Sequence, residues 1–380
     1  MPITDRESAR AWLEGQPHQV QVAFAARCAL RALPAIMNDK DAALRGLALP
    51  ALRAILTSGV AGTCPIPEVM RAAADASSSA YASANAANAA APSSSAAANA
   101  SSSAYAASSS ANTAAPSSAY AAASAANAAY AAADASSAAA DAAAATSAAY
   151  AAASADAAMS SGEGESVDVF LRPLWPGGAL PEGLARQHEK LRSFWKDAAP
   201  VWTFWQSWYE DMLAGRPVDW DFLRQVVLLP DEDWKRGAAH IARLIEKLRA
   251  KRDLQGSIED LEQDLTGTAS SRLGLGGNNP PEPLDQDSQL PAGLLIVWAP
   301  LQELKEEAEK QAPDPARLRK ATDALILALA EIATWCGRKL DRATDKAIDW
   351  GVPAGLGYLV LHQDKIRAVI EAAEAFLKLP

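Results

Sequence analysis

The chain has few of the residues that build disulfides, metal sites or nucleophilic centres. It contains three cysteines and four histidines in 380 residues. A small, odd number of cysteines excludes a disulfide scaffold and suits a reducing compartment, and the first residues contain no secretion signal, so we expect a cytoplasmic protein. The histidines lie in separate segments, without a cysteine or second histidine at metal-ligand spacing. The sequence therefore predicts neither a metal site nor a cofactor.

Positive charge is also in deficit. Lys and Arg number 35 against 45 Asp and Glu, which gives a formal net charge of −10. Because a non-specific nucleic-acid binder needs a basic surface to neutralise phosphates, we exclude nucleic acid as a partner. No apolar run reaches the ~18 residues typical of a membrane-spanning helix. The apolar stretches at 291–301, 321–336 and 352–361 are predicted to be core helices.

Motifs for nucleophilic or phosphate chemistry are missing as well. There is no G-x-S-x-G elbow, and the one glycine-rich segment, 274–281, has no preceding strand and no following Lys-Ser/Thr. The acidic group at 231–233 and His240 are the place to expect a dispersed active site, but acids in a first helical turn are typical of a favourable contact with the helix dipole. We therefore predict a non-enzymatic protein without catalytic residues.

Alanine and serine are present in excess. Residues 72–158 contain 49 alanines and 20 serines in 87 positions, and their four charged residues are all aspartates. Within this block, residues 77–100 align without gaps to residues 101–124. Alanine is the best helix former, and a 24-residue unit with one proline predicts short helices broken at Pro92 and Pro116.

Two interpretations of this block stay open. We expect helix over 118–158, whereas 77–117 could be helix or a low-complexity spacer, because serine competes for backbone hydrogen bonds. The tyrosines of the block are expected to pack against neighbouring helices rather than to bind a ligand.

Outside the block, the periodicity favours helices. An amphipathic helix is predicted over 19–33, with Arg27 and Arg31 on its flank at i, i+4. Alternating apolar residues over 167–171 predict one short strand. A strong helix is expected from about 233 to 252.

Five tryptophans at helical spacing form the candidate interaction surface. Large aromatic residues in this pattern are more often core or helix–helix interface than an exposed platform for a peptide or carbohydrate, and we favour the core. The five residues are Trp195, Trp202, Trp205, Trp208 and Trp234.

Together these patterns predict a mainly α, multi-module protein with an alanine-rich helical segment and a carboxy-terminal helical bundle. The first module is residues 1–160, which includes the repeat helices. A tryptophan-rich module follows at 161–265, then a Gly/Asn/Pro linker at 266–291 and the bundle at 292–380.

Two parts of the chain resemble bacterial proteins. Ala11-Trp12-Leu13-Glu14, the segment 23–34, the tyrosine-spaced alanine tract and Pro173-Leu174-Trp175-Pro176 resemble uncharacterised, alanine-rich bacterial proteins, some of which are similar to a predicted immunity-protein family of polymorphic toxin systems. Residues 274–282 resemble a G-x-G-H-N-N-P-P-E segment of mobile-element proteins, with Gly277 in the place of its histidine. The resemblance implies no catalytic residue.

These observations lead to a functional hypothesis with alternatives. We expect an interaction factor associated with immunity or defence that presents a helical surface to a partner protein. The rival is a membrane-acting effector whose carboxy-terminal helices, 315–377, associate with a bilayer. An enzyme with a dispersed site is the third class.

Overall fold

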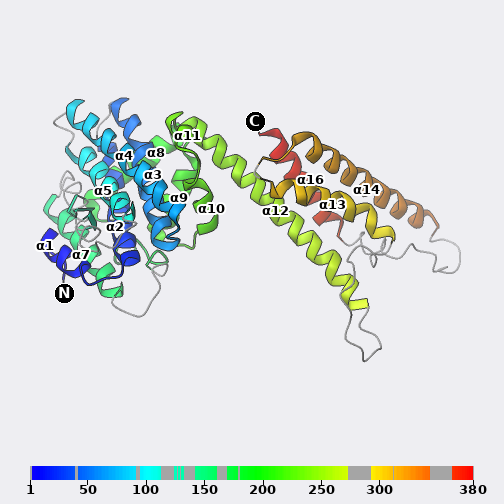
Figure 1. Cartoon of the computed structure of the whole chain (residues 1–380), viewed down its shortest axis with the longest axis horizontal. Helices are drawn as coiled ribbons and strands as arrows, with labels where there is room; N and C mark the ends of the chain where they lie inside the picture. Colours follow the sequence, from blue (N-terminus) through cyan, green and yellow to red (C-terminus); the bar gives the residue numbers. More distant parts are fainter. Residues whose placement is uncertain are drawn as a thin grey trace. The chain divides into compact units, whose positions relative to one another are not determined.

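The computed structural model describes residues 2–38, 42–90, 95–112, 124–125, 127–128, 130–131, 142–160, 169–178, 180–272, 292–310, 312–342 and 362–379. These residues form fourteen α-helices and one 3-10 helix and contain no β-strand, which confirms the mainly α fold (Figure 1). They group into two compact units, Met1–Ile245 and Glu246–Pro380. This division differs from the predicted one, because the alanine-rich helices and the tryptophan-rich helices belong to the same unit.

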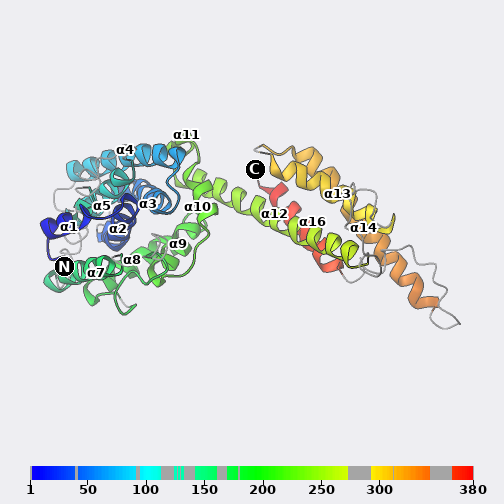
Figure 2. The same ribbon diagram turned by 60° about the horizontal axis from the view of Figure 1, so that its bottom comes forward.

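The first unit is an all-helical assembly, seen from a second side in Figure 2. Its helices are α1 (Arg6–Leu13), α2 (His18–Ala32), η1 (Leu33–Asn38), α3 (Ala42–Thr63), α4 (Pro67–Ala90), α5 (Ser95–Asn112), α7 (Ala142–Ser160), α8 (Glu182–Asp197), α9 (Thr203–Ala214), α10 (Trp220–Val227), α11 (Asp231–Lys235) and the beginning of α12 (Ala238–Arg272).

Helix α2 is the centre of this unit and is buried on every side from Val20 onwards. The prediction of an amphipathic helix with Arg27 and Arg31 on its flank is therefore wrong. Arg27 and Arg31 are buried because both guanidinium groups bind Asp156 of α7, at 3.0 and 2.6 Å. A buried charge is tolerated only when it is paired and hydrogen-bonded, and here both guanidinium groups share the Asp156 carboxylate as their counter-ion.

The same two arginines hold the segment after α7 against α2. Arg27 donates hydrogen bonds to the carbonyls of Val169, Arg172 and Pro173, at 2.7, 3.1 and 2.9 Å. Arg31 donates to the carbonyl of Leu174 at 2.9 Å. The planar guanidinium supplies several donors in a fixed fork, which one ammonium group could not do. Long-range polar contacts therefore join the predicted first and second modules into one unit.

The segment 169–178 consists of turns rather than a strand. The predicted strand over 167–171 is wrong for residues 169–171, and its first two residues lie outside the described residues. Gly215, which ends α9 with φ +67°, packs against this segment. A Cβ at Gly215 would lie 2.2 Å from the carbonyl carbon of Arg172, so only glycine fits.

The alanine-rich segment is helical wherever it is described between 77 and 112, as α4 and α5. The predicted breaks at Pro92 and Pro116 lie outside the described residues. Alanines of the two helices are fully buried: Ala73, Ala76, Ala80, Ala104, Ala107 and Ala111. Small side chains let the backbones approach closely. Serine hydroxyls complete the seam, since the hydroxyls of Ser77 and Ser109 share a hydrogen bond of 2.8 Å and that of Ser58 donates to the carbonyl of Ala107.

Helix α3 packs beside this pair and continues through Pro50 without a break. Its window Gly46–Thr63 is the one stretch, among the described residues, that is long and apolar enough to cross a membrane, with a mean hydropathy of 1.2. Of this window, 83% is buried inside the unit, as in the core helix of a soluble protein.

The helix predicted over 233–252 is divided in two. Helix α11 ends at Lys235, Gly237 adopts φ +91°, and α12 then runs for 35 residues to Arg272. Residues 266–272 of the predicted linker are consequently helical, and the rest of that linker lies outside the described residues.

The second unit is a helical bundle, as predicted. Its helices are the remainder of α12, α13 (Ala292–Glu309), α14 (Pro315–Arg342) and α16 (Gln363–Lys378). Helix α14 is capped at its start, because the Asp314 carboxylate accepts a hydrogen bond from the backbone N–H of Ala316. One apolar stripe from each helix meets in the core, with Leu261, Leu301, Leu325 and Ile366 fully buried.

Candidate functional site

The five candidate tryptophans lie in the core of the first unit. Trp195, Trp202, Trp205, Trp208 and Trp234 are all buried. The Trp205 and Trp208 rings meet edge to face with 5.9 Å between their centroids, and the Trp195 ring meets Tyr209 edge to face. This confirms the favoured core interpretation. The alternative, an exposed interaction surface, is wrong for these residues.

The acidic group at 231–233 is divided between two sets of partners. The Asp233 carboxylate accepts a hydrogen bond from the His240 ring at 2.8 Å between Oδ1 and Nε2, so the structure does bring these two candidates together. Asp231 instead binds Arg53 and Lys235, and Glu232 also binds Lys235. Each acid therefore has a partner close at hand, which is typical of an ion-pair network that ends and joins helices. Among the described residues, no group of three or more His, Cys, Asp or Glu side chains could hold a metal ion.

A groove lined by tyrosines is the most distinctive surface of the first unit. It has a volume of about 320 Å³. Tyr81 of α4 and Tyr105 of α5 form its centre, with their ring centroids 5.2 Å apart and the planes tilted by 46°. Tyr81 is 54% exposed and Tyr130 is 49% exposed. The described residues that line it are Tyr81, Asn85, Asn99, Ser102, Tyr105, Ala106, Asn127, Tyr130 and Ala131.

The helical repeat explains how these side chains meet. Tyr81 and Tyr105 occupy equivalent positions of the 24-residue unit. In each helix the alanine before the tyrosine, Ala80 or Ala104, is fully buried in the seam between helices. Successive residues of an α-helix point about 100° apart, so burial of the alanine leaves the tyrosine at the surface. Asn85 follows Tyr81 by four residues and shares its face.

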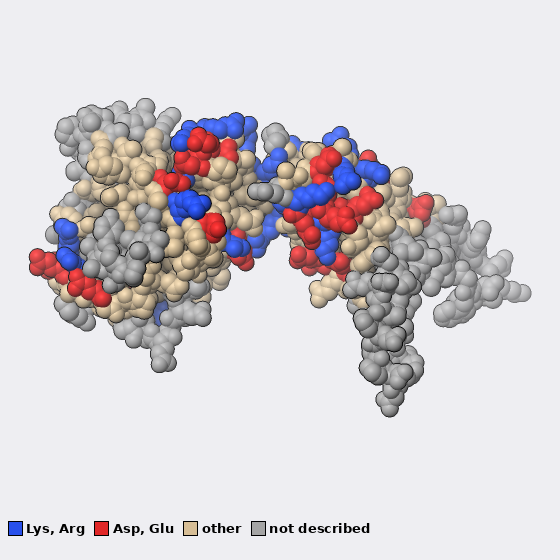
Figure 3. Space-filling model, viewed as in Figure 1, with Lys and Arg blue, Asp and Glu red and all other residues tan. Residues whose placement is uncertain are grey.

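The described part of the groove lining is uncharged. None of the described residues that line it carries a formal charge. Two aspartates of the alanine-rich block that the structure describes lie elsewhere: Asp156 is buried with the arginines, and Asp75 lines a different pocket. Figure 3 shows tan surface over α4 and α5, whereas red and blue side chains gather over α11. Aromatic faces, amides and hydroxyls are therefore the groups that this groove offers to a ligand.

The sequence analysis missed this groove, because it expected the tyrosines to pack against neighbouring helices. Tyr105 partly does so, but Tyr81 and Tyr130 are half exposed. The 24-residue repeat was the signal in the sequence that could have predicted the exposed tyrosines. A large side chain that recurs at one position of an otherwise small-residue helix must project beyond a seam built from alanine and serine.

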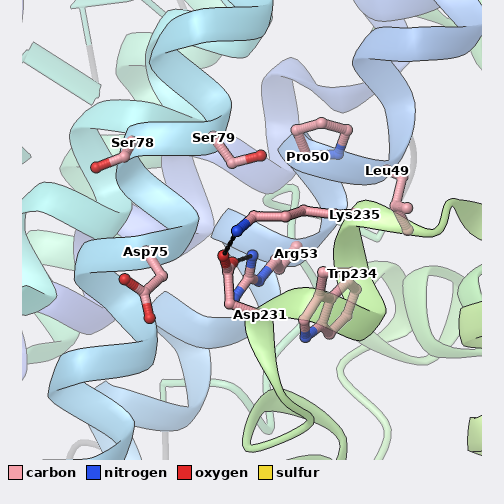
Figure 4. Close-up of a pocket in the computed structure, with 9 residues that line it drawn as sticks. All are labelled: Leu49, Pro50, Arg53, Asp75, Ser78, Ser79, Asp231, Trp234 and Lys235. Atoms are coloured by element: carbon pink, nitrogen blue, oxygen red, sulfur yellow. Dashed lines mark hydrogen bonds and ion pairs between the residues drawn. The ribbon is translucent and has the colours of Figure 1, made fainter.

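A second pocket of about 300 Å³ lies between α3, α4 and α11 (Figure 4). Its walls are Leu49, Pro50 and Arg53 of α3, Asp75, Ser78 and Ser79 of α4, and Asp231, Trp234 and Lys235 of α11. Unlike the tyrosine groove, it is rich in charge of both signs. Candidate residues of the sequence analysis, Asp231 and Trp234, therefore reach a surface pocket, although the buried indole of Trp234 offers little area to it.

Comparisons with protein-family models, with curated proteins and with solved structures find no match to this chain.

Proposed function

We propose that this chain is a non-enzymatic interaction factor that binds a partner protein through the tyrosine groove. The observation that carries the proposal is the pair of half-exposed tyrosines, Tyr81 and Tyr130, beside a groove of about 320 Å³. Tyrosine is enriched at protein interfaces, where it supplies a large, rigid contact area at low cost in conformational entropy.

The rest of the lining fits the same use. Asparagine and serine provide adaptable hydrogen bonds, and the combination of Tyr, Ser and Asn is the one that antibody binding loops use. A charged side chain entering the groove would lose hydration without meeting an opposite charge in the lining. The described lining therefore suits a partner segment that is uncharged and carries hydrogen-bonding groups.

The cellular role is part of the proposal. An association with immunity or defence is supported by the resemblance of residues 11–14, 23–34 and 173–176 to the proteins described above. A cytoplasmic location is supported by the small, odd number of cysteines, of which Cys28 and Cys64 are free thiols.

The test is capture of partners from the native host with three tagged full-length chains. They are the unmodified chain, the double variant Tyr81→Ala/Tyr130→Ala, and the control Ile326→Ala/Leu327→Ala, which removes two exposed side chains from α14 of the other unit. Alanine preserves helix propensity, and circular dichroism checks that helicity is unchanged.

We expect a stoichiometric protein partner with the unmodified chain and with the control, and loss of that partner with the tyrosine variant. Equal recovery by all three chains would refute binding through the groove. A specific turnover activity in the purified chain would refute the non-enzymatic proposal.

A second candidate function, a membrane-acting effector, is supported by one observation in the second unit. On α14, Ile326 and Leu327 are 40% and 67% exposed, and Leu327 lines a surface hollow with Arg319 and Lys320. Exposed apolar residues beside basic ones suit the interface of an anionic bilayer. This candidate predicts co-sedimentation with phosphatidylserine vesicles that Ile326→Ala/Leu327→Ala abolishes and Tyr81→Ala/Tyr130→Ala leaves unchanged.

A further inference from the structure

Two carboxylates line the charged pocket between α3, α4 and α11. Asp231 forms ion pairs with Arg53 and Lys235, whereas Asp75 forms none with a described residue. Arg53 is almost fully buried, with 4% of its side chain exposed, and its guanidinium lies 4.8 Å from the centre of the Trp234 ring. Its Nη1 donates to Oδ1 of Asp231 at 2.7 Å. Because a buried guanidinium needs its counter-ion, this half of the Asp231 carboxylate is committed to Arg53.

The other oxygen of Asp231 is held less firmly. Lys235 reaches Oδ2 at 2.9 Å, but 62% of the Lys235 side chain is exposed. Hydrogen bonds from Arg53, and then from Lys235, lower the pKa of Asp231 below its ordinary value. Asp231 is therefore ionised at neutral pH. An exposed ion pair contributes at most about 1 kcal/mol, so another cation can replace Lys235 at little cost.

The opposite wall offers acceptors that are free. Asp75 is exposed and lines the pocket, and no described residue forms an ion pair or hydrogen bond with its carboxylate. Ser79 extends from α4 toward the side of Pro50 and Lys235, as Figure 4 shows, and its hydroxyl likewise has no partner among the described residues. Leu49 and Pro50 supply an apolar wall next to these groups.

We propose that this pocket binds an organic cation of the lysine or arginine type. Its ammonium or guanidinium group contacts the Asp75 carboxylate and the Ser79 hydroxyl, and takes the place of Lys235 at Oδ2 of Asp231. Its methylene stem lies against Leu49 and Pro50, as such stems do on apolar surface. The overall charge of −10 favours the approach of a cation. This site is independent of the tyrosine groove.

An anion is the competing ligand, since Arg53 and Lys235 also line the pocket. Both cations already share Asp231, and Asp75 would repel an anion from the opposite wall. The observations thus favour a cation. The two ligands predict effects of opposite sign in the same variants, which makes the proposal easy to overturn.

The experiment is titration of the full chain with small probes by calorimetry and ligand-observed NMR. The cationic probes are N-acetyl-lysine methylamide, which mimics a side chain of a partner protein, and cadaverine, which mimics a free amine. The norleucine analogue is the neutral control and N-acetyl-glutamate methylamide is the anionic one. Tighter binding of the capped lysine assigns the site to a protein side chain, and tighter binding of cadaverine assigns it to a free amine.

Three variants test the geometry. Asp75→Asn should weaken binding of the cationic probe about tenfold, the scale of one charge-assisted hydrogen bond. Lys235→Gln should strengthen it about threefold or more, because the competitor at Asp231 is removed. Glu68→Gln, which removes an equal charge from the first turn of α4 outside the pocket, should leave it unchanged.

The proposal is overturned if the norleucine analogue binds as well as the lysine probe, or if no cationic probe binds. It is equally overturned if the anionic probe binds and the two pocket variants act with the opposite signs.

Discussion

Neutralising Asp156 tests the view that the first unit is built around a buried charge cluster. Asp156→Asn keeps the size of the side chain and removes its charge. The Asp156 side chain is 2% exposed, and its two oxygens bind Arg27 and Arg31, which are equally buried. Burial lowers the pKa of Arg27, and the Asp156 charge opposes that effect. Without Asp156, two guanidinium groups would remain in the interior with no counter-ion.

The expected magnitude follows from the burial of all three groups. Removing one partner of a buried ion pair costs about 3–5 kcal/mol, because the other charge is left uncompensated. Domains are stable by only about 5–15 kcal/mol, so the variant loses a large part of the unfolding free energy of this unit. With a denaturant slope of about 2–3 kcal/mol per M urea, the unfolding midpoint should fall by about 1–2 M.

Tryptophan fluorescence during urea unfolding is the appropriate assay. Eight of the eleven tryptophans precede residue 246, so the signal reports mainly on the first unit. The matched control is Asp75→Asn, an exposed aspartate whose replacement should change the unfolding free energy by less than about 0.5 kcal/mol. If both variants unfold at the same midpoint as the unmodified chain, the cluster does not stabilise this unit and the reasoning is wrong.

Three further predictions follow from single residues. Gly215→Ala should lower the unfolding free energy of the first unit by at least about 2 kcal/mol in urea unfolding. Gly178 is also at positive φ but in open space, so Gly178→Ala should lower it by about 1 kcal/mol. Equal losses in the two variants would contradict the packing argument. Burial raises the pKa of the Cys28 thiol to about 12, so mass spectrometry should find it unlabelled by iodoacetamide at pH 8 and labelled after unfolding. A hydrogen bond from Lys310 lowers the pKa of Glu307 below 4.5, so its contribution to stability is complete above about pH 4.5 and is lost as the pH falls through the lower folded-state pKa. Urea unfolding at pH 6 and pH 3 should therefore show a smaller acid-induced loss in Glu307→Gln.

Local signals predicted much of the helical architecture. The starts of α4 at Pro67 and of α14 after Asp314 carry such signals, because proline at the first position and a capping aspartate act within one turn. The end of α11 was missed, since the helical pattern around Gly237 continues on both sides. A glycine at positive φ was needed to separate two helices that propensity alone would join.

Local signals of this kind could not predict that Arg27 and Arg31 are buried. Arg27 and Arg31 at i, i+4 look like the solvated flank of a surface helix. Their fate depends on Asp156, which is more than 120 residues away in the chain, and on carbonyls of 169–174. No pattern within the helix itself distinguishes a buried pair of arginines from an exposed pair. The tyrosine groove depends in the same way on the pairing of α4 with α5, which decides which side chains are left outside.

The pairing of α4 with α5 has a consequence for how this chain can change over generations. Residues 77–100 and 101–124 are near copies, so unequal copying of the gene adds or removes 24 residues at a time. Each added unit would bring its own alanines and serines for the next seam and its own tyrosine. Helices with individually matched large side chains would be left with clashes and voids after the same event. The length of the groove can therefore change in whole steps, by duplication or deletion of a unit rather than by the redesign of a core.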